Sequence, residues 1–350
     1  MVKKMSQCKC RQKDYLSTYN TPDKYSVVYD DYWEFAQERQ TILYKKMLRI
    51  PGPWTDDIII KNYKFTNSYR ATDRVSQYLI RSVIYAEKEF SPEDTLFRIL
   101  LFKMFNKIET WEYLEQSLGE ISYKTYSYLL YDRLLTRLMS NKICIYSGAY
   151  ILPSGKSAFG SKVKHRNNLQ LLEMMMSSKL SKHIAEAESL KELFEILLSY
   201  PTLGRFLAFQ YAIDINYSDL TDFDEMSFVV AGPGAERGIR KCFPDRQGVS
   251  AESIIKEVAD RQDWEFLQRG IDFHSLNGRP LQLIDCQNLF CEIDKYSRVA
   301  HPGMFDSNRV RIKQKYKHTN LPPIDFFFPP KWGINQGFKQ FVEGCCNVFL

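Results

Sequence analysis

The chain has 350 residues, of which 44% are hydrophobic and 14% aromatic, enough to build a large core as one elaborated domain or two closely packed ones. No run of about 18 apolar residues occurs and the polar N-terminus lacks an apolar leader, so the composition excludes membrane-spanning and secreted classes. We therefore expect a cytoplasmic protein with no membrane partner. The net charge of only +6 is a weak argument for nucleic acid by itself.

Three parts are expected along the chain: an N-terminal extension (1–60), a helical core (61–300) and a basic C-terminal segment packed on that core (301–350). The first 54 residues are rich in aromatic side chains and end in the Pro51-Gly-Pro sequence, which is typical of a turn. This composition predicts an irregular extension that wraps the core.

Two arginines and an asparagine near a predicted helix start are candidate ligands for phosphate. Arg70 and Arg74 lie one helical turn apart, and Asn67 precedes them. An arginine so placed can bind phosphate or hold a carboxylate through two hydrogen bonds. A structural ion pair from Arg70 to Asp73 or Asp94 is the alternative.

A long apolar helix is predicted after Ser91, which supplies an N-cap and is followed by a proline and two acidic residues. A further helix is expected over 123–138, and 153–161 is expected to be a loop. The Ser-Gly-Lys-Ser sequence in that loop lacks the earlier glycine of a Walker loop. The spacing therefore excludes this phosphate-loop interpretation.

A helical hairpin is predicted between 188 and 213. Apolar residues recur at helical spacing up to Tyr200, Pro201 and Gly204 interrupt the pattern, and a second apolar helix begins at Arg205. Exposed backbone N–H groups at such a helix start can bind a DNA phosphate, and a glycine permits close approach. A hairpin that only connects two packed helices is the alternative.

This hairpin resembles the helix-hairpin-helix of base-excision DNA glycosylases, in which the catalytic aspartate lies twenty residues after the second glycine. Counting from Gly204 gives Asp224. Thr202 and Leu207 depart from the usual glycine and threonine, and Phe206 stands where strand-cleaving relatives have a lysine. The resemblance thus implies a monofunctional enzyme.

The segment 222–237 is acidic, then extended, then rich in glycine, and its Gly232-Pro-Gly turn can approach a ligand or a DNA backbone or form a simple bend. Farther on, Asp285, Asn288 and Glu292 occupy successive turns of a predicted helix, either as a binding surface or as a buried structural network.

Basic residues alternate over 309–317, which on a strand places five cations on one face. That face either tracks a phosphate backbone or protects a sheet edge.

Taken together, several motifs between about Lys61 and Arg298 resemble a DNA base hypermodification family, the α-glutamyl/putrescinyl-thymine pyrophosphorylase group, which is related to helical domains of hydroxymethyluracil DNA kinases. The motifs include Phe65-Thr-Asn, Gly204-Arg-Phe-Leu-Ala-Phe-Gln with Asp214, Ala231-Gly-Pro-Gly-Ala and Cys291-Glu-Ile-Asp-Lys-Tyr. The resemblance implies a mainly α fold with a glycosylase-like helical core, a few short strands and an N-terminal extension. It also implies action on modified pyrimidines in phage DNA.

We expect a monofunctional DNA glycosylase that flips and excises a hypermodified pyrimidine in antiviral defence, and whose carboxylate stabilises the charged sugar. The alternatives are a transferase that displaces pyrophosphate from a modified thymine with an amine, and a DNA-binding protein without catalysis. An insertion between the hairpin and the helix that follows it would make Asp285 or Asp294 the equivalent of the catalytic aspartate. The candidate residues are Asp224, Asp222 and Asp294 for catalysis; Asn67, Asn106, Gln210, Gln287 and Asn288 for the base pocket; and Arg70, Arg74, Gly204, Arg205, Gly232, Gly234, Arg237, Arg309, Arg311, Lys313, Lys315 and Lys317 for DNA.

No cofactor and no metal are expected. The five histidines are widely spaced, and the eight cysteines contain no Cys-x-x-Cys pair, which argues against a zinc site and an iron–sulfur cluster. The expected partner is double-stranded DNA that carries modified bases, with no obligate protein partner.

Overall fold

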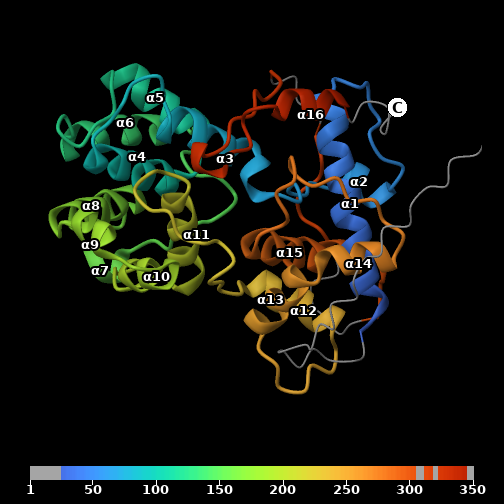
Figure 1. Ribbon diagram of the computed structural model, residues 1–350. Helices are drawn as coiled ribbons and strands as arrows, with labels where there is room; N and C mark the ends of the chain where they lie inside the picture. Colours follow the sequence, from blue (N-terminus) through green and yellow to red (C-terminus); the bar gives the residue numbers. More distant parts are fainter. Residues whose placement is uncertain (1–24, 305–310, 318–321, 345–350) are drawn as a thin grey trace, which may run out of the picture.

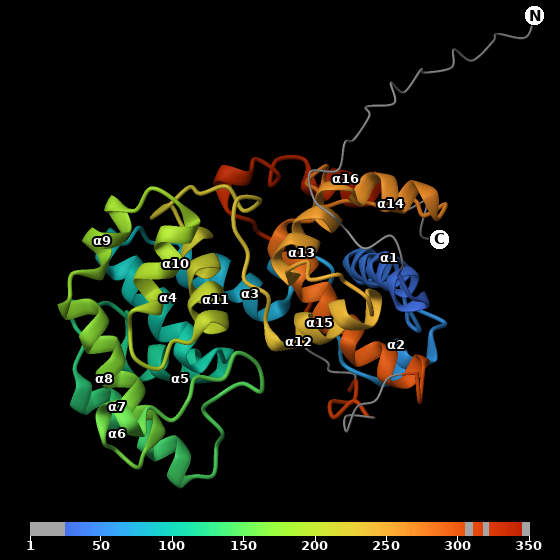
Figure 2. The ribbon, with the colours of Figure 1, turned by 90° about the horizontal axis from the view of Figure 1, so that it is seen from below.

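The computed structural model describes residues 25–304, 311–317 and 322–344, and it is mainly helical, as predicted. Its helices form two lobes (Figure 1), and the same division is visible after a 90° rotation (Figure 2). Short helical elements join the lobes: η1 (Arg70–Thr72), α3 (Arg74–Tyr78) and η2 (Leu79–Ile84). In the described part of the chain, no helix is long and apolar enough to cross a membrane.

The first lobe is continuous in sequence, whereas the second combines the two ends of the chain. The first lobe contains α4 (Pro92–Phe105), α5 (Ile108–Leu118), α6 (Tyr128–Ser140), α7 (Lys156–Phe159), α8 (Lys164–Ser177), α9 (Leu180–Glu186), α10 (Leu190–Leu198) and α11 (Arg205–Asn216). The second contains α1 (Val27–Met47), α2 (Ile58–Asn62), α12 (Pro233–Cys242), α13 (Ala251–Asp260), α14 (Gln262–Gln268), α15 (Leu283–Ala300) and α16 (Phe338–Gly344). The short element η3 (Pro330–Trp332) lies at the junction, where Trp332 packs on Tyr217. The three-part division expected from the sequence stays a prediction.

Helix α1 corrects the expectation of an irregular N-terminal segment over residues 27–47. The Ser26 hydroxyl accepts the Val28 N–H at 3.2 Å and so caps the helix. Tyr29, Tyr32 and Trp33 are buried against α12, α14 and α15, where they make edge-on and tilted ring contacts. Aromatic side chains at helical spacing therefore form part of the core of the second lobe.

Helix α4 occupies the centre of the first lobe. It begins as predicted, with the Ser91 hydroxyl accepting the Asp94 N–H at 3.1 Å and Pro92 at the first helical position. Every residue from Leu96 to Phe105 is buried, including two basic ones. Arg98 donates to the carbonyls of Val83 and Ile121, at 2.9 and 3.0 Å, and to that of Ser82. The other basic residue, Lys103, forms an ion pair with Asp214 of α11 and is described below.

The predicted hairpin is confirmed as α10 and α11, which pack on each other. Thr202 in the connecting turn has φ +73°, in the left-handed region, and Gly204 then begins α11 in an extended conformation. No side chain caps the start of α11, and both Gly204 and Arg205 are exposed. The hairpin therefore presents unpaired backbone N–H groups to solvent, although this geometry alone does not identify a glycosylase.

Close packing of α12 on α15 organises the second lobe. A Cβ atom added to Gly238 would lie 2.0 Å from the carbonyl oxygen of Phe290, and one added to Gly234 would lie 2.9 Å from the Cys291 sulfur. Gly232 is likewise covered by the ring of Phe206, which would lie 2.6 Å from an added Cβ atom. The glycines of the Gly-Pro-Gly segment thus serve helix packing, which leaves no room for a ligand at their Cα atoms.

The expected basic strand is not formed in its described part, residues 311–317. Only an isolated bridge joins Lys315 to Tyr63, with main-chain hydrogen bonds from Lys64 to Gln314 and from Tyr316 to Asn62. The partner segment is only a few residues long because α2 ends at Asn62, so a ladder cannot continue. Arg311, Lys313, Lys315 and Lys317 are nevertheless exposed, and Arg309 lies outside the described residues. The few short strands expected from the sequence are likewise absent among the described residues.

Candidate functional site at the lobe junction

Residues 65–73 carry the chain from the second lobe to the junction, and side chains hold this segment in place. Arg39 of α1 donates to the Thr66 carbonyl at 2.9 Å and to the side-chain oxygen of Asn67 at 3.0 Å. The Asn67 main-chain N–H donates to the Asp73 carboxylate at 2.9 Å, and its side-chain amide donates to Thr72 at 3.1 Å. Asn67, which was predicted to contact a base, is thus used to shape the segment that positions Arg70.

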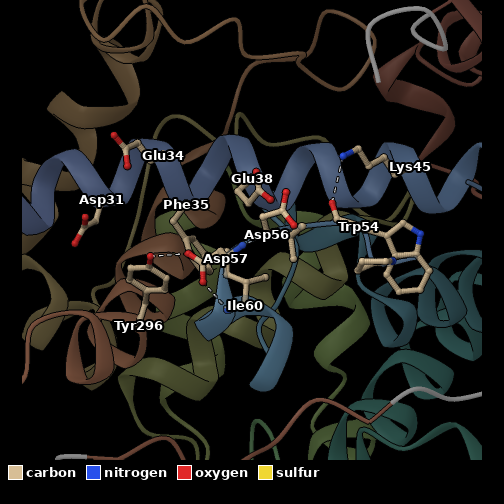
Figure 3. A pocket seen from close by; sticks show the side chains of 12 residues that line it. Asp31, Glu34, Phe35, Glu38, Lys45, Trp54, Asp56, Asp57, Ile60 and Tyr296 are labelled. Atoms are coloured by element: carbon tan, nitrogen blue, oxygen red, sulfur yellow. Dashed lines mark hydrogen bonds between the residues drawn. The ribbon is translucent and has the colours of Figure 1, made fainter. Parts of the chain in front are cut away.

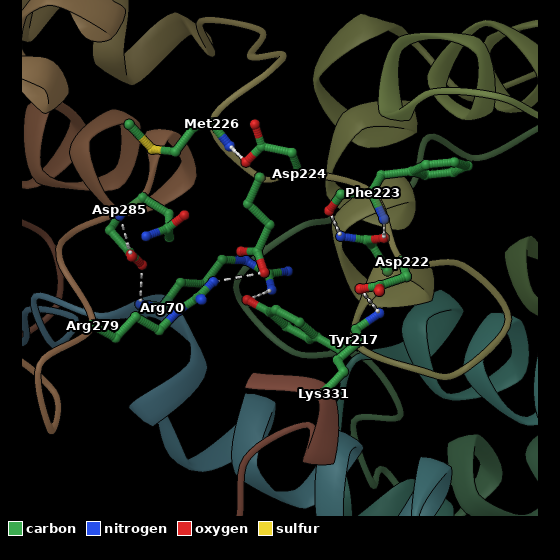
Figure 4. A network of polar contacts seen from close by, with 12 residues as sticks. Arg70, Tyr217, Asp222, Phe223, Asp224, Met226, Arg279, Asp285 and Lys331 are labelled. Atoms are coloured by element: carbon green, nitrogen blue, oxygen red, sulfur yellow. Dashed lines mark hydrogen bonds and ion pairs between the residues drawn. The ribbon is translucent and has the colours of Figure 1, made fainter. Parts of the chain in front are cut away.

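Arg70 is the centre of a buried polar cluster that joins the two lobes, and we call this cluster the Arg70 network. The guanidinium donates to Asp214 at 2.6 Å, to the Gln210 side chain at 3.1 Å and to the Tyr217 hydroxyl at 3.0 Å. All three partners come from α11 or the residue that ends it. Figure 4 shows Arg70 and Tyr217 meeting between the lobes. The network is completed by Lys103 of α4, whose ammonium nitrogen lies 2.5 Å from the second Asp214 oxygen.

The Arg70 network contains two cations and one carboxylate. Arg70, Lys103 and Asp214 are each at most 2% exposed. Burial of an unbalanced charge is costly, and burial lowers the pKa of Lys103 to about 8 despite the opposing effect of Asp214. The Tyr150 ring lies over both cations, 4.2 Å from the Lys103 nitrogen and 5.6 Å from the Arg70 guanidinium carbon. A net positive charge is therefore held beneath an aromatic ring.

Helix α15 supplies the other wall of the junction. Asp285 accepts the Arg70 main-chain N–H at 2.7 Å and the Gln282 N–H at 3.0 Å, and burial raises the pKa of this carboxyl to about 7. Gln287 accepts from Gln210 at 3.4 Å and approaches the Cys291 sulfur at 3.0 Å. Gln210 and Gln287, both predicted for the base pocket, are thus brought together across the lobes, next to Arg70.

The Lys103 charge makes a testable contribution to pH-dependent stability. Because its pKa is about 8 in the folded chain against 10.5 ordinarily, the unfolded chain holds more protons between these pH values. The free energy of unfolding should therefore rise with pH between these two pKa values, by at most about 1.4 kcal/mol per pH unit. Below the lower pKa, the Lys103 ammonium should add no pH dependence. Urea unfolding of wild type and Lys103→Met measures the effect, since the titrations of groups that do not interact with Lys103 cancel in the difference.

We expect Lys103→Met to be more stable than wild type near neutral pH, because Arg70 and Asp214 then form a balanced pair. Its advantage should shrink as the pH rises from about 8 to about 10. A stability difference that stays constant over this range would show that Lys103 is not held in an unfavourable charged state.

The carboxylates predicted for catalysis do not converge on the Arg70 network. Asp222 and Asp224 are exposed in the turn after α11, where Asp224 accepts the Met226 N–H at 2.8 Å (Figure 4). Asp294 is buried on α15 and forms ion pairs with Arg237 at 3.0 Å and with Lys241 and Arg298 at 3.1 and 2.5 Å. These contacts fix α12 to α15, and they occupy Arg237, which was predicted to bind DNA.

The remaining predicted residues lie at varied distances from the network. Asn106 ends α4 with φ +49° and donates to the Ser147 hydroxyl at 3.1 Å, so it anchors the chain that leads to Tyr150. Asn288 is buried on α15, and its amide nitrogen has no hydrogen-bond partner among the described residues. Arg74 is partly exposed and donates to the Pro322 carbonyl at 2.8 Å.

The sequence analysis missed four members of this junction. Lys103, Tyr150 and Tyr217 were not named, and Asp214 was named in a motif without a role. A signal for two of them is present in the sequence. Lys103 interrupts the apolar run from Ile99 to Phe105 in α4, and Asp214 interrupts the apolar sequence of α11. Charged residues within buried helices require partners, and the two helices pack on each other.

A separate pocket of about 420 Å³ lies between α1, α2 and Tyr296. Figure 3 shows its acidic lining, to which α1 contributes Glu34 and Glu38 and the segment before α2 contributes Asp56 and Asp57. A carboxylate surface repels DNA phosphates, so this face is unsuited to nucleic acid. No cluster of His, Cys, Asp and Glu side chains among the described residues has the arrangement of a metal site.

Comparison with known proteins identifies the family. Residues 26–305 match the helical domain of 5-hmdU DNA kinase. The chain therefore belongs to this helical-domain family. It is also 25% identical over 304 residues to a 5-hmdU DNA kinase of Bacillus phage SP10. The matched part is 79% of the chain but 46% of the phage protein, so the chain spans less than half of that relative's length. No solved structure matches significantly.

Membership of the 5-hmdU DNA kinase helical-domain family corrects the predicted function. The phage relative is a kinase, which transfers a phosphoryl group, whereas the sequence led us to expect a hydrolytic DNA glycosylase that flips and excises a base. That expectation is wrong, and the alternative of amine-for-pyrophosphate exchange finds no support either. The broader resemblance, to proteins that hypermodify bases in phage DNA, is confirmed.

Proposed function

We propose that this chain binds DNA containing 5-hydroxymethyl-2′-deoxyuridine and holds the modified base at the lobe junction for phosphoryl transfer to its hydroxyl group. The observation that supports this most directly is the family match over residues 26–305, which includes every member of the Arg70 network. The kinase activity named for the phage relative belongs to a protein more than twice as long as the matched segment. We therefore assign recognition of the modified DNA to this chain.

The junction offers the chemistry that this recognition requires. Gln210 and Gln287 carry amide donors and acceptors suited to a pyrimidine edge, and the cations Arg70 and Lys103 can donate hydrogen bonds to the hydroxymethyl oxygen. A thymine methyl group cannot accept these hydrogen bonds, which would give preference for the hydroxymethylated base.

The DNA backbone is assigned to the exposed hairpin and to the basic segment. The start of α11, with Gly204 and Arg205, presents N–H groups and a cation, and residues 311–317 add four exposed basic side chains. These contacts do not read sequence, so they should strengthen binding to any duplex. Placement within the α-glutamyl/putrescinyl-thymine pyrophosphorylase group also stays a proposal.

Titration of fluorescent duplexes that carry one 5-hydroxymethyl-2′-deoxyuridine, or thymine at the same position, tests the proposed function. Wild type should bind the modified duplex about tenfold more tightly, because one hydrogen bond from a charged donor is gained. Arg205→Ala should weaken both duplexes equally and lower the dependence of log K on log salt by about 1. The exposed Arg133 on α6 provides the control: Arg133→Ala should leave both affinities unchanged. Equal affinity of wild type for the two duplexes would contradict the proposal.

A further inference from the structure

The Arg70 network has more hydrogen-bond donors than acceptors. A guanidinium carries five N–H groups, and the contacts of Arg70 within the described residues engage Gln210, Tyr217 and Asp214, one N–H group each. The Lys103 ammonium carries three, and its polar contact there is Asp214. About four N–H groups on these two buried cations therefore have no hydrogen-bond acceptor among the described residues, whereas buried donors are ordinarily satisfied.

No neighbouring group among the described residues supplies the missing negative charge. Burial raises the pKa of Tyr150 to about 12 and that of Tyr217 further, so both phenols are neutral near pH 8. Asp285 accepts main-chain N–H groups and caps α15, and its pKa is raised to about 7. Asp73 is engaged by the Asn67 N–H, and burial raises its pKa to about 6. Both carboxylates serve main-chain N–H groups, and neither forms an ion pair with Lys103.

The ring above the cations is carried by residues 148–153, in which Leu152 is buried in the core and Tyr150 packs against it. Residues 148–153 form no helix, and the flanking chain is fixed at Ser147, whose N–H donates to Phe105, and at Ser154, whose carbonyl accepts from Asn167. Between these anchors Tyr150 turns inward with φ +53° and stacks on Phe206, 6.0 Å between ring centres. Rotation of the Tyr150 side chain alone would uncover the side of both cations on which its ring lies.

Donor excess and net positive charge are the properties of an anion site, and here an aromatic ring lies over the two cations. We propose that Arg70 and Lys103 form a binding site for a phosphoryl group, with Tyr150 as its removable cover. A phosphate monoester has several acceptor oxygens, which match the unfilled donors, and its negative charge more than offsets the single net positive charge of the network. We assign this phosphoryl group to the modified methylene of the base, an assignment that rests on the proposed function. The lobe junction would then bind the product of phosphoryl transfer as well as its substrate.

Isothermal titration of the whole chain near pH 8 tests the site, with three probes: inorganic phosphate, 5-phosphomethyl-2′-deoxyuridine and dimethyl phosphate. Titration in two buffers of different ionisation enthalpy reports proton uptake. A bound dianion should raise the pKa of Lys103, so that about half a proton is taken up per site. The nucleoside monoester should bind most tightly and inorganic phosphate more weakly, whereas a diester monoanion should bind least. Tightest binding of dimethyl phosphate would instead assign the site to the DNA backbone and overturn the product assignment.

Two variants identify the residues responsible. Lys103→Met should lower monoester affinity at least tenfold and abolish proton uptake, while Lys88→Met should behave as wild type. Lys88 is a matched control because it also contacts a single carboxylate, Glu120, at 2.5 Å, but it is exposed. Tyr150→Ala should retain or increase monoester affinity, because it removes the cover and leaves both cations in place. Unchanged affinity in Lys103→Met, or no monoester binding by either wild type or Tyr150→Ala, would overturn the site.

The two proposals fail in distinguishable ways. Preference for hydroxymethylated duplex together with absent phosphate binding would overturn the phosphoryl site and leave the proposed function intact. Phosphate binding that depends on Lys103, together with equal affinity for modified and unmodified duplexes, would overturn the proposed function and retain an anion site.

Discussion

Asp214→Asn should destabilise the chain by about 3–5 kcal/mol, the cost of removing one partner from a buried ion pair. The carboxylate contacts both Arg70 and Lys103, and all three side chains are at most 2% exposed. An asparagine keeps the volume but leaves two buried cations without a counter-charge. Urea unfolding followed by circular dichroism measures the loss.

Two further variants separate the charge effect from a packing effect. Asp56→Asn removes a carboxylate whose ion pair with Lys61 lies on the surface, and it should change stability little. Adding Lys103→Met to Asp214→Asn should restore part of the lost stability, because one uncompensated cation is removed. If the double variant is less stable than Asp214→Asn alone, the buried charges do not interact as the geometry indicates.

Gly238→Ala should destabilise the chain by about 3 kcal/mol, near the upper end of the usual cost of overpacking. The added Cβ would lie 2.0 Å from the Phe290 carbonyl oxygen, which belongs to the backbone of α15 and cannot rotate away. Helices α12 and α15 would have to separate, and the aromatic contacts of Tyr32 with Phe290 would loosen. The loss should appear as a lower urea midpoint with an unchanged slope.

Gly344, the last residue of α16, provides the control for Gly238, because no atom of the described residues lies within 4 Å of an added Cβ. Gly344→Ala should leave stability unchanged or slightly higher, since alanine favours a helix. Equal effects of the two substitutions would show that close packing of α12 on α15 is not a source of stability.

Local signals in the sequence predicted much of the helical architecture. The Ser91 cap with Pro92 marks the start of α4, and the break at Pro201 and Gly204 separates α10 from α11. Helix α15 was also expected. These features are set by residues a few positions apart, where capping and periodicity act directly.

The errors arose where the outcome depends on distant partners. Alternating basic residues over 309–317 fit a strand, but a strand needs a neighbour, and the described part meets only the short segment after α2. The aromatic residues of α1 were assigned to an irregular segment because the elements that bury them lie more than 200 residues away in the sequence. The Arg70 network likewise joins residues 70, 103 and 214, whose proximity follows from the packing of the two lobes.

The glycosylase prediction shows how little one spacing can establish. Asp224 lies twenty residues after Gly204, yet it is an exposed residue whose carboxylate holds the Met226 N–H in a turn. The family match instead rests on 280 consecutive residues, 26–305. The separated motifs indicated the broader group of base-hypermodification proteins because they are distributed over most of this matched region.

The affinity ratio between hydroxymethylated and thymine duplexes, compared in wild type, Lys103→Met and Lys88→Met, tests most directly whether the lobe junction recognises the modified base. We predict about a tenfold preference in wild type and in Lys88→Met, and its loss in Lys103→Met without weaker binding of the thymine duplex. A preference that persists in Lys103→Met, or one that is absent from wild type, would contradict recognition of the modified base at this junction.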